Sequence, residues 1–173
     1  MSNGVRYNVS YSIISLLSAY GAGAKRIVDF VISMFNNAHY FGVPGDLRSV
    51  YVHGNVGYRR VYGYVMYIRR FRSVSIHIGG VSRIRREFGD CAAYWGGWQV
   101  LAHEIAHLVG VGGGRYLRHG SIHLSVAKEL LLETLPLEIA VPSTYYLLID
   151  YSLGIECKRG YSGGFRGSLL LMN

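Results

Sequence analysis

The chain has 173 residues, of which half are hydrophobic and 16% are charged. A chain of this length can bury one hydrophobic core, and its apolar content excludes a disordered protein. The net charge is +8, and most of the basic residues are arginine, whose planar guanidinium binds phosphate through paired hydrogen bonds. We therefore expect a single domain over residues 1–173. Its positive charge is compatible with a polyanionic partner but does not require one.

The cysteines and the N-terminus bear on location. Cys91 and Cys157 are too few for a disulfide framework and lack zinc-ribbon spacing, so we expect free thiols and a cytoplasmic protein. The apolar run from Ile13 to Tyr20, followed by Ala22-Gly23-Ala24, loosely imitates a signal peptide, which makes secretion the alternative. No apolar run reaches the roughly eighteen residues that a membrane span needs, so we expect no membrane partner.

The first half of the chain changes from helical to strand patterning. Apolar residues at helical spacing predict two helices between about Tyr11 and Tyr40, joined near Gly21-Ala22-Gly23. Alternation of Val, Tyr and Ile with polar residues then predicts a small antiparallel sheet. Its three expected strands are Ser49 to His53, Tyr58 to Arg69 and Ser73 to Ile78.

Arginines gather near the ends of these expected strands. They are Arg59, Arg60, Arg69, Arg70 and Arg72. A solvated basic rim is the default interpretation, and a nucleic-acid-binding track is the alternative.

The second half predicts helices. One should begin at Trp98 and end at Gly110, which suits a glycine cap. A second should run from Ser121 to about Leu135, and a third from Ser143, after Pro142, to about Leu153. Together with the expected sheet, these helices predict an α+β fold.

The helix expected after Trp98 carries the most informative motif, His103-Glu104-Ile105-Ala106-His107, in an otherwise apolar stretch. Residues four apart on a helix lie about 40° apart around its axis, so both imidazoles can face one metal ion. Glu104 is placed to hold and deprotonate a water molecule on that metal. The motif therefore predicts a catalytic Zn²⁺ site with His103 and His107 as ligands.

A catalytic zinc normally takes three protein ligands, so a third must lie downstream. His119 follows a glycine-rich reversal and stands at a helix start, which makes it our first candidate. His123, four residues later, could share its face and act as a ligand or as an electrophile in catalysis. Glu129 and Glu133 on the same expected helix are the remaining candidates.

The order of H-E-x-x-H, loop, His119-Gly120 and helix resembles SprT-like zinc metallopeptidases, over about residues 98 to 135. In that family a His-Gly-x-x-aromatic element supplies the third ligand, and here His123 stands at the aromatic position. The resemblance implies a zincin-like fold, His119 as a ligand and a link to DNA-associated protein substrates. A glutamate ligand from the following helix would instead imply the gluzincin arrangement.

These observations predict a zinc-dependent metallopeptidase that cleaves a protein or peptide substrate. Zinc would lower the pKa of its water and polarise the scissile carbonyl, and Glu104 would act as general base. His123, or one of Tyr145, Tyr146 and Tyr151, could stabilise the oxyanion. The alternative is a basic nucleic-acid-binding or structural protein in which the metal only stabilises the fold.

Overall fold

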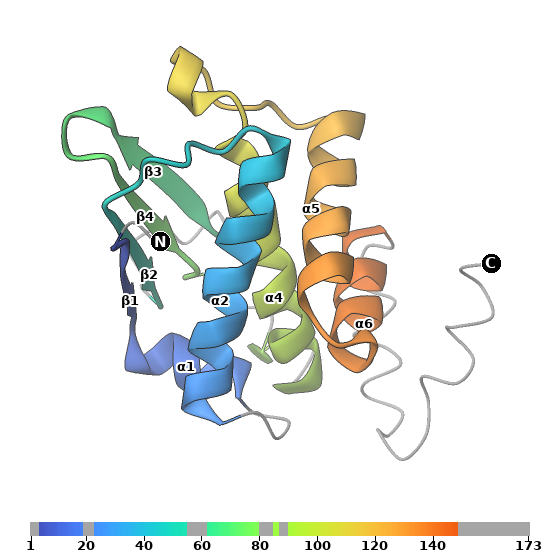
Figure 1. Cartoon of the computed structure of the whole chain (residues 1–173). Coiled ribbons are helices and arrows are strands. Elements are labelled where there is room, and N and C mark those ends of the chain that lie inside the picture. Colours follow the sequence, from blue (N-terminus) through green and yellow to red (C-terminus); the bar gives the residue numbers. More distant parts are fainter. Residues whose placement is uncertain (1–3, 19–22, 55–61, 80–84, 87–89, 149–173) are drawn as a thin grey trace.

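The computed structural model describes residues 4–18, 23–54, 62–79, 85–86 and 90–148 (Figure 1). In this part of the chain a small sheet lies beside a set of helices, which confirms the expected α+β class. The elements are β1 (Arg6–Val9), α1 (Tyr11–Leu17), α2 (Ala24–Ala38), η1 (His39–Phe41), β2 (Ser49–His53), β3 (Tyr64–Ile68), η2 (Arg69–Phe71), β4 (Ser73–His77), α4 (Asp90–His107), η3 (Val111–Gly113), α5 (Ser121–Thr134) and α6 (Leu137–Leu148).

The sheet is mixed, with strand order β1-β2-β4-β3. β1 pairs with β2 and β2 with β4 in parallel, whereas β3 is antiparallel to β4 and forms one edge. The expected antiparallel meander is therefore wrong, and β1 was missed. Alternation of polar and apolar residues identifies a strand but does not give the direction of its neighbour, and a four-residue strand carries little of that signal.

The two faces of the sheet differ in chemistry. Val50, Val52, Val74 and Ile76 are fully buried on the face that meets the helices. On the opposite face, rings from neighbouring strands stack side by side, with His77 4.3 Å from Tyr64 between ring centroids. The face toward the helices is thus the one that contributes to the core.

The helices form two further layers beside the sheet, with α2 and α4 next to it and α5 and α6 beyond them (Figure 1). α2 buries one stripe at helical spacing, and its members are Ile27, Val31, Met34, Phe35 and Ala38. This stripe and the split into α1 and α2 agree with the expected pair of N-terminal helices. None of the helices in the described ranges is long and apolar enough to cross a lipid bilayer.

α4 is the central helix, and it begins at Asp90 rather than at Trp98 as expected. Gly97 lies inside the helix, where the absence of a side chain allows close packing. A β-carbon at Gly97 would lie 3.0 Å from Cδ2 of Leu17, so α1 approaches the backbone of α4 there. Glycine in this case indicates a helix contact and not a helix end.

The helices after α4 agree only partly with expectation. α5 begins at Ser121 as expected, although its N-cap is Gly120 and no side chain caps it. α6 begins at Leu137 and contains Pro142, so a helix starting after Pro142 was wrong. Residues beyond 148, including Tyr151 and Cys157, lie outside the described residues, as do the side chains of Tyr145 and Tyr146.

Candidate metal centre

Two histidines of the centre come from the C-terminal part of α4. His103 and His107 are one turn apart, and their Nε2 atoms lie 3.2 Å from each other. The helix ends after His107 with tighter turns, and Gly110 follows with φ of 81°, a value that L side chains rarely adopt. The helix therefore presents both imidazoles at its end, next to a reversal of the chain.

His119 returns to the same point from the loop between η3 and α5. Its Nε2 lies 3.0 Å from Nε2 of His103 and 3.1 Å from Nε2 of His107. The loop is tied to α4, because the backbone N–H of Leu117 donates to the carbonyl oxygen of His107 at 2.9 Å. The reversal between the two ligand segments also uses Gly114 at φ of 93°. The structure thus brings His103, His107 and His119 together.

The three Nε2 atoms form a nearly equilateral triangle of 3.0 to 3.2 Å. Zinc with nitrogen ligands at about 2.0–2.1 Å in tetrahedral geometry separates those nitrogens by about 3.3 Å, so the triangle fits. Nδ1–H of His107 donates to the carbonyl oxygen of Leu117 at 2.6 Å, so Nε2 of that ring carries no hydrogen and has a free lone pair. A ring nitrogen with a free lone pair is the form of imidazole that binds a metal ion.

His123, in the first turn of α5, is the fourth histidine of the cluster. The candidate ligand atoms of the four histidines lie within 4.8 Å of one another, so the group can hold a metal ion. His123 is only 3% exposed, and its Nε2–H donates to the carbonyl oxygen of His103 at 2.9 Å. Its ring packs 4.1 Å from that of His107 between centroids. This packing suits a residue that orients the neighbouring rings better than one that stabilises an oxyanion.

Glu104 lies beside the histidines and is 5% exposed. Burial raises the pKa of its carboxyl to about 7, since desolvation disfavours the charged form. A β-carbon at Gly63 would lie 3.0 Å from Oε1 of Glu104 and 2.6 Å from Cγ1 of Val100. The chain just before β3 therefore approaches Glu104 so closely that only glycine fits without a shift.

A cavity of about 590 Å³ opens beside this cluster. It is bounded by the start of β3, by α4 and by the loop that carries His119. Its lining residues are Tyr62, Gly63, Tyr64, Val65, Gln99, Val100, His103, Glu104, His107, Tyr116 and His119. A cavity of this size suits a bound ligand or a short peptide segment.

The remaining sequence candidates take no part in the cluster. Among the described residues the metal-binding group contains neither Glu129 nor Glu133. At about 1.5 Å per residue, these glutamates lie about 9 and 15 Å further along the helix than His123. The gluzincin alternative therefore has no support from the geometry.

The expected arginine rim is described only in part, because Arg59 and Arg60 lie outside the described residues. Arg69 donates to the carbonyl oxygen of Gly112 at 2.8 Å, and Arg72 forms an ion pair with Asp46 at 3.3 Å. These contacts link η2 to its neighbours. They favour a structural use of these two arginines over phosphate binding, and the nucleic-acid track stays a prediction.

Comparison of the chain with protein-family models, with curated proteins and with solved structures finds no match. We therefore infer the chemistry of the centre from the geometry of its own residues.

Sequence reasoning missed Gly63 and Tyr116, which both line the cavity. Gly63 interrupts the alternation of the expected strand and Tyr116 lies between two ligand segments, and these were the signals available.

Burial also lowers the pKa of the histidines. The pKa of His103 falls to about 3 through burial and then through repulsion from the other three imidazoles. The pKa of His123 falls to about 4 for the same first cause, and that of His107 is also lowered by burial. Neutral imidazoles are the forms that bind metal, so the fold keeps these rings ready for a cation.

We expect the metal-free protein to lose stability as the pH falls from 6.5 to 4.5. In this window His103, His107 and His123 gain protons more readily in the unfolded chain, because their pKa values are lowered in the folded one. Glu104 gains its proton more readily in the folded chain, because its pKa is raised there. The balance should cost about 1–2 kcal/mol of unfolding free energy per pH unit. Urea unfolding in EDTA across this range measures it.

Glu104→Gln removes the opposing contribution, so its pH dependence should be steeper than that of the wild type. A flat profile in both proteins would contradict the assigned burial of the histidines.

Proposed function

We propose that this protein is a zinc-dependent metallopeptidase with a zincin-like fold. The observation that carries the proposal is the convergence of three imidazole nitrogens, 3.0 to 3.2 Å apart, on a cavity that also contains the buried carboxyl of Glu104. Three ligands leave one position of a tetrahedral zinc open, which is the arrangement of catalytic sites. Bound zinc would acidify water and polarise a carbonyl group.

Within this proposal His103, His107 and His119 hold the metal, and Glu104 moves the proton. In the metal-free site burial raises the pKa of its carboxyl, so it accepts a proton more readily than an exposed glutamate does. A carboxylate oxygen can then take a proton from the attacking water and return it to the nitrogen of the leaving amine. The low exposure of Glu104 limits competition from bulk water for that proton.

The edge of the sheet supports a peptide as substrate. β3 is a terminal strand of the sheet, and Val65 lines the cavity. In an antiparallel pair, alternate residues direct their N–H and C=O groups toward and away from the neighbouring strand. The N–H of Tyr67 points away from β4, so the backbone groups of Val65 do the same. An extended peptide can pair with them as an added strand.

A metal that only stabilises the fold is the second candidate, and the fourth histidine is the observation that favours it. If His123 completed four protein ligands, the site would be closed and structural. The hydrogen bond from His123 to His103 leaves Nδ1 as the ring nitrogen that could bind the metal, just as the contact with Leu117 leaves Nε2 of His107, so the ligand count has to be measured. The two candidates differ in whether Glu104 has any function.

Cleavage of peptides tests the proposal. We expect the zinc-loaded protein to cleave members of a peptide library detected by mass spectrometry, EDTA to abolish cleavage, and added zinc to restore it. Reduced and denatured casein serves as a second substrate. Cleavage that persists after the metal is removed, or none by a protein shown to carry one zinc ion, would reject the proposed reaction.

A further inference from the structure

Tyr116 occupies an unusual position, because its hydroxyl binds the edge of the sheet. The backbone N–H of Tyr67 in β3 donates to the hydroxyl oxygen of Tyr116 at 2.8 Å. Tyr116 belongs to the loop that ends at His119, lines the cavity and is 44% exposed. The side chain of Tyr116, from the loop that carries His119, therefore lies at the edge of β3 where a paired strand would lie.

The loop that carries Tyr116 is held at both ends. Beyond it, Leu117 exchanges two hydrogen bonds with His107, one from its backbone N–H and one to its carbonyl oxygen. Before it, Gly112 accepts a hydrogen bond from Arg69, which directly follows β3. The phenol of Tyr116 is thus held against the end of β3 by contacts on either side of it.

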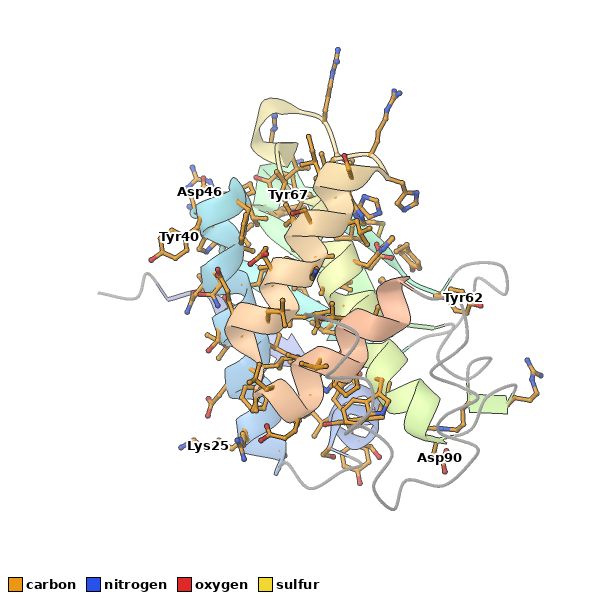
Figure 2. The ribbon with its side chains drawn as sticks, turned by 90° about the vertical axis from the view of Figure 1, so that its right-hand side faces the viewer. Lys25, Tyr40, Asp46, Tyr62, Tyr67 and Asp90 are labelled. Atoms are coloured by element: carbon orange, nitrogen blue, oxygen red, sulfur yellow. The ribbon has the colours of Figure 1, made fainter. Side chains whose placement is uncertain are left out.

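The bonded amide lies at one end of the available edge. Val65 lines the cavity, whereas Tyr67, two residues later, is not among its lining residues. Figure 2 shows Tyr67 near the loop at the top of the view and Tyr62 farther down and to the right. A peptide that pairs with Val65 and continues in this direction meets Tyr116 at the next pairing position.

We propose that Tyr116 is a specificity-determining residue that closes the substrate-binding edge of β3 after Val65. This inference rests on the proposed function. The hydroxyl of Tyr116 occupies the N–H of Tyr67, so a substrate strand cannot pair with that N–H and turns away after Val65. The preferred substrate is therefore a short extended segment next to a turn or a chain end, and not a long strand.

Amide exchange of the zinc-loaded protein tests the contact itself. Tyr116→Phe removes only the hydroxyl, and we expect exchange of the Tyr67 amide to become about threefold to tenfold faster, as for loss of one hydrogen bond. Tyr40→Phe, at an exposed tyrosine in η1, is the matched control and should change nothing. Unchanged exchange in Tyr116→Phe would overturn the proposal.

Peptide binding tests the consequence. Kd is measured for peptides lengthened stepwise at their N-terminal and at their C-terminal end, with Glu104→Gln as the background to prevent turnover and zinc content checked in every variant. In the Glu104→Gln protein, Kd should stay the same when the peptide is extended past Val65. Addition of Tyr116→Ala should let the extended peptides bind about threefold to tenfold more tightly.

The outcomes separate this inference from the proposed function. If extended peptides bind the Tyr116→Ala protein more tightly but the wild type cleaves no peptide, the peptidase is rejected and the role of Tyr116 at the edge of β3 is supported. If the wild type cleaves peptides but extension does not tighten binding to the variant, the peptidase is supported and the role of Tyr116 is rejected. Absence of peptide binding in all variants would overturn both, and loss of zinc in Tyr116→Ala leaves the exchange measurement as the deciding result.

Discussion

Replacing Glu104 with glutamine is expected to lower kcat/KM for peptide hydrolysis by about 10²- to 10⁴-fold while the zinc content stays at one ion per chain. Glutamine keeps the shape of the side chain but accepts no proton from water. The variant should also unfold at pH 8 no more easily than the wild type, because it removes a carboxylate whose pKa is raised by burial. Steady-state kinetics, metal analysis and thermal unfolding measure the three quantities.

A matched control is Glu138→Gln, which changes a glutamate at the start of α6 and should leave activity intact. Equal hydrolysis by Glu104→Gln and the wild type would remove Glu104 from the mechanism. A variant that loses zinc together with activity would show that Glu104 supports the metal site, and the role of general base would then fail.

The second large effect concerns the ligands. His103→Ala, His107→Ala and His119→Ala should each reduce zinc affinity by more than about 100-fold, because each removes one of three converging nitrogens. His123→Phe, which keeps a packed ring, should cost about 10- to 100-fold, the range for a group that orients ligands. Competition with a fluorescent zinc chelator measures all four affinities.

Glu129→Ala and Glu133→Ala are the controls for the ligand series and should bind zinc as the wild type does. A greater loss from either glutamate variant than from His119→Ala would move the third ligand to α5 and revive the gluzincin arrangement. A loss in His123→Phe as large as that of the three ligand variants would indicate four ligands and a structural metal.

Several features of the centre could be predicted because they are local. His103, Glu104 and His107 lie within five residues of one helix, and helical geometry alone brings the two imidazoles to one face. The expected spans of β2 and α5 and the amphipathic stripe of α2 agree with the structure for the same reason. In each case the periodicity of the side chains depends only on neighbours in the chain.

Local signals were misleading where a distant element set the outcome. The helix expected to begin at Trp98 begins at Asp90, and Gly97 lies inside it, where Leu17 of α1 approaches its backbone. Pro142 suggests a helix start but lies inside α6. The parallel pairing of β2 with β4 depends on how the chain crosses the sheet, which alternation of residue types does not encode.

By itself, then, the sequence determined the helix with two imidazoles and a carboxylate, and it narrowed the third ligand to a few downstream residues. The tertiary structure decided that His119 and not Glu129 or Glu133 joins them, because the anchored loop brings His119 to 3.0 Å from His103. It also decided that Gly63 meets Glu104 and that Tyr116 meets the edge of β3. The last two contacts join residues about 40 to 50 positions apart in the chain. Only the packing of the sheet against α4 and the loop after it brings these residues within reach of each other.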